Sequence, residues 1–417
     1  MLSILGIFFF FVVFLFLLHR MTRNKTVSLS AVEITLAFGC KVLMGCLYGY
    51  IFLHYFGGDD TWVFHAESLA EYEELFNNPS LFFHDFLPGP FFSQADSFVQ
   101  GIGLYAQNLE KQLSFKSLAI FNIFSRGDYY INVVFFSFFG FWGHYFLFAL
   151  LAKEFPQKRK VLLFVIFFFP PVVFWLSGIR GDSWIFFFTT LLLLYFNRWL
   201  QQRKLSALFV SLLALTGIFI FRNMLALLFL PALVAWWLAV RGYLKPAIAF
   251  LVTYGIACTV FFGSVLLSPE KNLPAIVVKR QQQFFALQGN TRFRLDSLQT
   301  NMGSFVKVTP QAFQNTFLRP FPWEAKGIFQ VVSSLDILFF WALFLLFLWR
   351  REKRLQDYIR NPLILCFLFF GISSFFFIGF SIPFPGAIVR YKIVAELLLL
   401  IIFLLNIKWP ERTHSIN

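Results

Sequence analysis

Long apolar blocks are the feature that most limits what this chain can fold into. Blocks of roughly 15 to 25 apolar residues recur along the 417-residue sequence, in which 59% of residues are hydrophobic and 13% are charged. A soluble core cannot be built from such blocks, because helices and strands at a water-facing surface need polar residues on one face. Runs of about twenty apolar residues match the roughly 30 Å hydrocarbon core of a bilayer at about 1.5 Å rise per residue. The sequence therefore predicts an all-α polytopic membrane protein.

The blocks predict about eleven transmembrane helices within a single domain, residues 1–417. Their predicted ranges are 2–19, 30–56, 131–152, 161–178, 183–197, 205–221, 224–240, 246–267, 328–349, 361–380 and 393–407. The first block has no basic segment before it and no small-residue cleavage site after it. We expect it to be a retained span rather than a signal peptide.

Clusters of Lys and Arg follow every second predicted span, and this placement matters more than the net charge of +14. They lie in residues 20–25, 153–160, 198–204, 241–245, 350–360 and 408–412. Basic loops favour the cytoplasmic side of a membrane, so we expect the N-terminus outside and the C-terminus in the cytoplasm. Membrane lipids are then the expected surroundings, and no nucleic-acid partner is needed to explain the positive charge.

Two long polar segments, residues 57–130 and 268–327, fall on the outer face in this topology. Within them, residues 61–76, 114–124 and 274–287 place apolar side chains at helical spacing among polar ones. We expect these stretches to form amphipathic helices that lie along the outer membrane interface.

The sequence Gly57-Gly58-Asp59-Asp60 opens the first outer segment and has two interpretations. In the structural one, the glycines end a span and an Asp caps the next helix. In the functional one, Asp59 or Asp60 accepts a proton from an acceptor hydroxyl while the other carboxylate orients it. The pair could instead anchor a divalent cation such as Mg²⁺ or Mn²⁺. His65 and Glu67, one to two turns further along, are candidate substrate-binding residues.

Arg180 and Asp182 lie at the predicted outer tip of a helical hairpin, residues 169–196. Asp182 could cap the second helix and Arg180 could extend to the membrane surface. Arg180 is nevertheless unusual, because positive charge is concentrated on the opposite side. Both residues are candidate substrate ligands.

Arg222, Arg390 and Lys392 border apolar blocks, where a cation is costly unless it meets an anion or water. The anion expected at an outer leaflet is a lipid phosphate, which Arg binds through two parallel hydrogen bonds. Lys392 has a competing partner in Glu396, one helical turn along. Phosphate binding and ordinary internal ion pairs both remain open for these residues.

The stretch FLRPFPWEAK, residues 317–326, combines Arg319, Trp323 and Glu324 directly before a predicted span. Trp commonly anchors a helix at the membrane interface. Sugars also bind to aromatic faces flanked by charged groups, so the three residues are candidate acceptor ligands.

Five segments, quoted in chain order, together resemble the multispanning glycosyltransferases of the C-type fold: GGDDTWVFHAESLAEY, FPPVVFWLSGIRGDSWIFFF, FRNMLALLFLP, FLRPFPWEAK and FPGAIVRYKI. The resemblance is closest to bacterial membrane proteins encoded among envelope polysaccharide functions. It implies an outer-face acidic residue, Asp59 or Asp60, as catalytic base and a polyprenyl-phosphate sugar as donor. It also implies the bacterial cytoplasmic (inner) membrane as location. This chain departs from the family pattern in having a span before the one that leads into the acidic segment.

The expected function is transfer of a sugar from the lipid-linked donor to a glycan or lipid acceptor. An O-antigen or exopolysaccharide polymerase or ligase, relying on outer-face arginines without an essential Asp, is the nearest alternative. A transporter or flippase for lipid-linked sugars would predict an internal repeat and broken helices, and the sequence shows neither. No Gly-rich nucleotide-binding loop is present in the sequence, which agrees with a lipid-linked donor.

Overall fold

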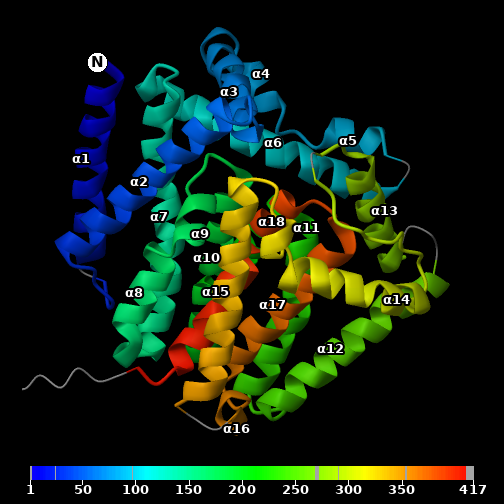
Figure 1. Ribbon diagram of the computed structural model, residues 1–417. Helices are drawn as coiled ribbons and strands as arrows, with labels where there is room; N and C mark the ends of the chain where they lie inside the picture. The colour runs from blue at the N-terminus through cyan, green and yellow to red at the C-terminus, as the bar shows by residue number, and fades with distance from the viewer. Residues whose placement is uncertain are drawn as a thin grey trace, which may run out of the picture. The chain divides into compact units, whose positions relative to one another are not determined.

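The computed structural model describes residues 2–23, 25–95, 97–267, 272–289, 291–352 and 355–409. It is 82% helical, and no β-strand occurs in these ranges (Figure 1). Residues 353–354 and 410–412, which belong to two of the predicted cytoplasmic clusters, lie outside the described residues, as do residues 413–417.

In the part of the chain that the structure describes, seven helices are long and apolar enough to cross a membrane. They are Ser3–Arg23, Ala31–His54, Tyr129–Glu154, Leu205–Val240, Pro246–Leu266, Ile328–Arg350 and Pro362–Ser381. The prediction of an all-α, multi-pass membrane protein is confirmed, whereas the total of about eleven spans stays a prediction.

Several predicted spans take other forms. The block 161–178 is divided between α8 (Arg159–Phe167) and α9 (Pro170–Trp175). The blocks 205–221 and 224–240 are joined in α11 (Leu205–Val240), which is interrupted at Arg222. The last block lies in α18 (Pro385–Asn406), whose first turns are charged. Broken helices are therefore present: the sequence predicted a connection at Arg222 but did not reveal the break between α8 and α9.

The chain, interpreted from its sequence as one domain, divides into two compact units, Met1–Leu227 and Leu228–Asn417. The helices of the first unit before α8 are α1 (Leu2–Arg23), α2 (Ala31–His54), α3 (Asp60–Asn77), α4 (Pro79–His84), α5 (Gly89–Ser93), α6 (Phe98–Ser125) and α7 (Tyr129–Glu154). After α9 it contains α10 (Gly181–Gln202) and the first part of α11.

Helix α7 is the centre of the first unit and packs against α1, α2, α6, α8 and α10. It is apolar on all sides, as a helix surrounded by other helices must be. A Cβ on Gly143 would lie 3.0 Å from the Cα of Phe187, so the glycine permits the close approach of α10.

The break between α8 and α9 comes at Pro170, which cannot continue the preceding helix. Buried polar side chains satisfy carbonyl groups around it. Lys41 Nζ donates to the carbonyl of Leu176 at 2.5 Å and lies 3.3 Å from His144 Nε2. His144 Nδ1 in turn lies 2.6 Å from the carbonyl of Ile166. These bonds let an irregular backbone persist among apolar helices.

The segment 57–130 is a packed helical layer in which α3 and α6 lie side by side (Figure 1). Lys116 of α6 bonds to Glu71 of α3 at 2.7 Å and to Asp85 at 3.0 Å. The Asn122 amide reaches Ser68 of α3 at 3.1 Å, and its oxygen accepts from Asn132 of α7. This layer places the start of α3 at a defined position.

The second unit contains the rest of α11 and, among its described residues, seven further α-helices. They are α12 (Pro246–Gly263), α13 (Leu273–Ala286), α14 (Met302–Phe313), α15 (Ile328–Arg350), α16 (Leu355–Tyr358), α17 (Pro362–Ser381) and α18. Helix α17 packs against α12, α13, α14 and α18. The buried Gln281 of α13 holds the extended segment that precedes α14, accepting from Leu298 N at 2.8 Å and donating to the Asp296 carbonyl at 3.1 Å.

Candidate functional site

Five of the residues predicted from the sequence come together in the first unit. We call Asp59, Asp60, Arg180, Asp182 and Arg222 the arginine–aspartate cluster. They come from the start of α3, the start of α10 and the break in α11. The cluster thus joins three segments that are far apart in the sequence.

The aspartate pair is positioned by a glycine turn after α2. Gly57 and Gly58 have φ of 71° and 96°, a region that favours glycine. Asp59 then occupies the N-cap position of α3, but its side chain makes no capping hydrogen bond. The capping interpretation therefore fails for Asp59, whose carboxylate accepts from Arg180 instead.

Arg180 connects the two carboxylates. Its Nη1 donates to Asp59 Oδ2 at 2.5 Å and to the hydroxyl oxygen of Tyr48 at 2.9 Å, while its Nη2 donates to Asp60 Oδ2. The planar guanidinium presents its donors in a fixed fork. One buried Arg side chain consequently sets the spacing of both carboxylates.

Asp182 links the two arginines. Its Oδ2 lies 4.0 Å from Arg180 Nε, and its Oδ1 accepts from Arg222 Nη2 at 2.8 Å. Asp182 was a candidate cap for α10, but Arg180 occupies the N-cap position and Asp182 lies in the first turn. Arg222 has φ of −160° and ψ of 82°, so the helix break lies where the sequence predicted a connection between two spans.

Exposure divides the cluster into an interior and an outer part. The side chains of Arg180 and Asp182 are 4% and 5% exposed, whereas those of Asp59 and Asp60 are 32% and 54% exposed. The buried charges compensate one another, as buried charges must. The two carboxylates that solvent can reach are therefore the groups available to a substrate.

The cluster is anionic as a whole, because three carboxylates surround two guanidinium groups. Glu110 of α6 adds a fourth nearby, its Oε1 lying 3.8 Å from the position of a Cβ on Gly181. Such a site suits a hydroxyl group or a proton better than a phosphate. The predicted phosphate-binding role of Arg222 gains no support from this arrangement.

His65 and Glu67 do not join the cluster. His65 is buried, with its ring edge-on to Trp62 and Tyr129 at centroid distances of 5.7 Å and 5.4 Å. Burial lowers the pKa of His65, and nearby Asp128 opposes the shift. Glu67 is exposed, and no hydrogen bond or ion pair connects it to the cluster in the described part of the chain.

Within the described residues, Asp59 and Asp60 do not belong to a group of three or more side chains that could hold a metal ion. Among the described residues, one group of at least three His, Cys, Asp or Glu side chains has its ligand atoms within 4.8 Å of one another: Glu71, Glu74 and Asp85. Lys116 already bonds to two of these carboxylates. The divalent cation considered for the aspartate pair stays a prediction.

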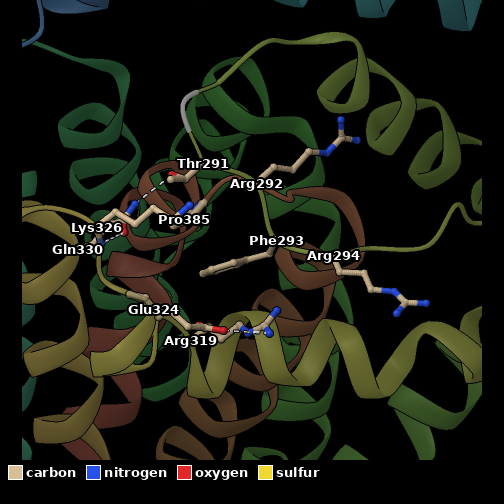
Figure 2. Close-up of a pocket in the computed structure, with 10 residues that line it drawn as sticks. Thr291, Arg292, Phe293, Arg294, Arg319, Glu324, Lys326, Gln330 and Pro385 are labelled. Atoms are coloured by element: carbon tan, nitrogen blue, oxygen red, sulfur yellow. Dashed lines mark hydrogen bonds and ion pairs between the residues drawn. The ribbon is translucent and has the colours of Figure 1, made fainter.

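A second group of predicted residues lies in the second unit, at a cavity of about 380 Å³ (Figure 2). Its lining consists of Thr291, Arg292, Phe293, Arg294, Arg319, Pro320, Glu324, Lys326, Gln330 and Pro385. Arg319 and Glu324, both predicted, form an ion pair of 3.0 Å in its wall. Trp323 does not line the cavity; it is 79% exposed and stacks on Phe321 at 4.8 Å.

The remaining candidates, Arg390 and Lys392, are elsewhere in the second unit. Lys392 is buried and forms an ion pair with Glu396 at 3.0 Å. Glu396 is the internal partner that the sequence offered as the alternative to a lipid phosphate. Arg390 lies beside Tyr391, with Cζ 5.1 Å from the ring centroid.

The sequence analysis did not identify several residues of the cluster, of the cavity and of the surroundings of Lys392. Tyr48 was hidden within an apolar span, where only its hydroxyl group distinguishes it from the surrounding Phe residues. Arg292 and Arg294 lie in a segment without a motif, although their charge on the predicted outer side was a usable signal. Lys326 ends the stretch FLRPFPWEAK but was not chosen as a candidate. Asp336 in α15 is buried and interacts with Glu396 and Lys392. It was another acidic residue inside an apolar block of the sequence.

Comparisons with protein-family models, curated proteins and solved structures find no match for this chain. The likeness to C-type-fold glycosyltransferases therefore stays a prediction, and the functional argument depends on the geometry of the site.

Proposed function

We propose that this protein is a membrane glycosyltransferase. It transfers a sugar from a polyprenyl-phosphate-linked donor to a glycan or lipid acceptor at the outer face of the bacterial cytoplasmic membrane, with its N-terminus outside and its C-terminus in the cytoplasm. The observation that carries the proposal is the half-exposed pair Asp59 and Asp60, held by one buried guanidinium group at the end of an apolar helix.

In the proposed reaction, the oxygen of the acceptor hydroxyl attacks the anomeric carbon of the donor. Asp59 or Asp60 takes the hydroxyl proton as the new C–O bond forms. The bond from the anomeric carbon to the phosphate oxygen breaks, and the polyprenyl phosphate leaves with the electron pair. Lateral diffusion in the membrane supplies the donor.

Arg180 has a positioning role in this mechanism. Each aspartate directs one carboxylate oxygen to the guanidinium group, and a carboxylate has more acceptor sites than this one bond uses. Because Arg180 is itself buried against Tyr48 and close to Asp182, it restricts the carboxylates to one geometry. Such restriction is what general-base catalysis needs from its surroundings.

The proposal is tested with the double variant Asp59→Asn/Asp60→Asn. Asn keeps an oxygen that accepts from Arg180 but cannot act as a base at neutral pH. We expect sugar transfer from labelled polyprenyl-phosphate sugars in membranes to fall by at least about a hundredfold, the usual scale of general-base catalysis. Expression and thermal stability in detergent are measured in parallel.

Glu73→Gln is the matched control, because Glu73 is an exposed carboxylate on the same helix. It is expected to leave transfer unchanged. Full transfer by a folded double variant would exclude the base assignment. An Arg390→Ala variant more damaging than the Asp pair would instead favour the O-antigen polymerase or ligase type of enzyme.

The helix breaks favour a second candidate function, a transporter for lipid-linked sugars. Breaks at Arg222 and between α8 and α9 are features of helices that line transport paths. A vesicle assay distinguishes the two candidates. Movement of a labelled lipid-linked sugar across the bilayer without formation of a new glycosidic bond would favour the transporter.

A further inference from the structure

The cavity in the second unit has an excess of positive charge in its lining. Arg319 and Lys326 contribute cations, and Glu324 contributes the one carboxylate of the lining. The guanidinium groups of Arg292 and Arg294 point away from the cavity in Figure 2, where Arg292 lies over Phe285 and Arg294 pairs with Asp296 at 3.7 Å. The Glu324 carboxylate already pairs with Arg319 at 3.0 Å. No ion pair of Lys326 occurs among the described residues, so the cavity is suited to an anionic ligand.

Neutral polar groups in the wall are held in place by one another. The Lys326 backbone N–H donates to Gln330 Oε1 at 2.7 Å, and Gln330 Nε2 donates to the Thr291 hydroxyl oxygen at 3.1 Å. The amide orientation of Gln330 is thereby fixed. The Thr291 hydroxyl keeps its own proton available for donation.

An aromatic ring lies between these groups. In Figure 2, Phe293 projects between the Arg319–Glu324 pair and the group formed by Thr291, Gln330 and Lys326. Its backbone N–H donates to the Pro383 carbonyl at 2.8 Å, and Arg319 Cζ lies 5.1 Å from the ring centroid. An apolar surface therefore lies beside charged and hydrogen-bonding groups.

One donor in the wall has no hydrogen-bond partner in the part of the chain that the structure describes. Arg319 Nε is buried, and no hydrogen-bond acceptor reaches it among the described residues. An unsatisfied buried donor costs free energy, and this atom is shielded from the cavity, so the remaining N–H groups of Arg319 are the ones that a ligand can reach.

We propose that the cavity is a subsite for an acidic saccharide, a sugar unit that carries a carboxylate or phosphate group. The sugar ring lies against Phe293, its hydroxyl groups bond to Thr291 and Gln330, and its anionic group faces Arg319 and Lys326. The volume of about 380 Å³ is in the range of small-molecule pockets and larger than a phosphate ion requires. The inference deepens the proposed function, on which it rests, by naming the class of saccharide.

Equilibrium binding to the full chain in lipid nanodiscs tests the proposal. The probes are D-glucuronate, glucose 6-phosphate, D-glucose and inorganic phosphate. Binding of the sugars is measured by saturation-transfer difference NMR, and binding of phosphate is measured by its competition with them. We expect at least one acidic sugar to bind about tenfold more tightly than glucose and than inorganic phosphate, because only it uses both charge and ring. The arm that binds, carboxylate or phosphate, identifies the anionic group.

Lys326→Ala should weaken binding of the acidic sugar by about three- to tenfold, and Phe293→Ala should weaken it to a similar extent. Lys279→Ala is the matched control, since Lys279 is an exposed lysine of α13 that does not line the cavity. Equal binding of glucose and the acidic sugars, binding of phosphate alone, or no effect of Lys326→Ala would overturn the proposal.

Binding needs no sugar transfer, so the same titration is made with the Asp59→Asn/Asp60→Asn variant. Unchanged binding with abolished transfer agrees with both proposals. Selective binding by a double variant that still transfers sugar would overturn the base assignment alone. If the double variant is inactive in sugar transfer and the protein binds acidic sugars no more tightly than glucose, only the proposal of the acidic-saccharide subsite is overturned.

Discussion

Arg222 donates a hydrogen bond of 2.8 Å to Asp182. Arg222 is also the residue at which the backbone of α11 departs from helical dihedral angles. The ion pair therefore connects a helix break to the first turn of α10. Asp182 also lies 4.0 Å from Arg180, so it compensates part of the charge of both arginines.

Replacing Asp182 with Ala should destabilise the protein strongly. The side chain is 5% exposed, and its loss leaves two arginines with less compensation, which typically costs about 3–5 kcal/mol for a buried pair. Thermal unfolding in detergent measures the change. Asp296→Ala is the control, because its pair with Arg294 spans 3.7 Å between exposed side chains and is expected to contribute at most about 1 kcal/mol. Equal shifts for the two variants would contradict this reading.

Gly58→Ala should be destabilising although a Cβ there meets no atom within 4 Å. Its φ of 96° is unfavourable for any residue with a side chain, at a cost of roughly 1–2 kcal/mol. Relaxation of the turn would also displace Asp59 and Asp60 and reduce sugar transfer. Gly89→Ala is the comparison, since Gly89 has equal space and no left-handed φ. A Gly58→Ala protein as stable and active as the Gly89→Ala protein would argue against a strained turn.

Acidification should destabilise the protein through His65. Burial lowers the pKa of His65 in the folded state below its ordinary value of about 6.5, so the unfolded chain takes up the proton first. The contribution to stability is complete above about pH 6.5 and is lost as the pH falls toward the folded pKa. The melting temperature of the wild type, followed from about pH 7.5 to 5.5, should fall more than that of His65→Gln. Parallel pH profiles would show that His65 does not contribute.

Lys116→Met should convert a structural ion-pair network into a cation-dependent one. Lys116 separates Glu71 and Asp85, which together with Glu74 have ligand atoms within 4.8 Å of one another. Without the ammonium group the carboxylates repel, and an added divalent cation such as Ca²⁺ can replace it. We expect a lower melting temperature that millimolar Ca²⁺ restores in this variant.

Lys111→Met is the matched control for this experiment, because Lys111 is an exposed lysine on the same helix. Neither it nor the wild type should respond to Ca²⁺. A Lys116→Met protein indifferent to Ca²⁺ would show that the carboxylates separate once the lysine is removed.

Composition was sufficient to predict the helical, membrane-spanning class, because the length of an apolar block reports directly on bilayer thickness. It did not reveal the break at Pro170, since the apolar residues on both sides continue without interruption and the compensating groups, Lys41 and His144, come from other helices. The interruption at Arg222 was predictable because a single charge divided two apolar blocks.

The members of the arginine–aspartate cluster were identified one at a time, each as a charge in an unexpected place. Their pairing was not predictable, because a capping Asp and an Arg-bound Asp have the same local sequence. The structure distinguishes a capping Asp from an Arg-bound Asp at position 59, because the Asp59 side chain makes no capping hydrogen bond and contacts Arg180. The cavity around Phe293 escaped notice for a similar reason: its cations come from segments that only folding brings together.

The bonds from Arg180 to Asp59 and Asp60 span 121 and 120 positions of the chain. During biosynthesis, the aspartates are therefore inserted long before their guanidinium partner has been translated. A nascent or truncated chain that ends before this arginine cannot organise the carboxylates, so measured transfer would also report on completed assembly of the first unit.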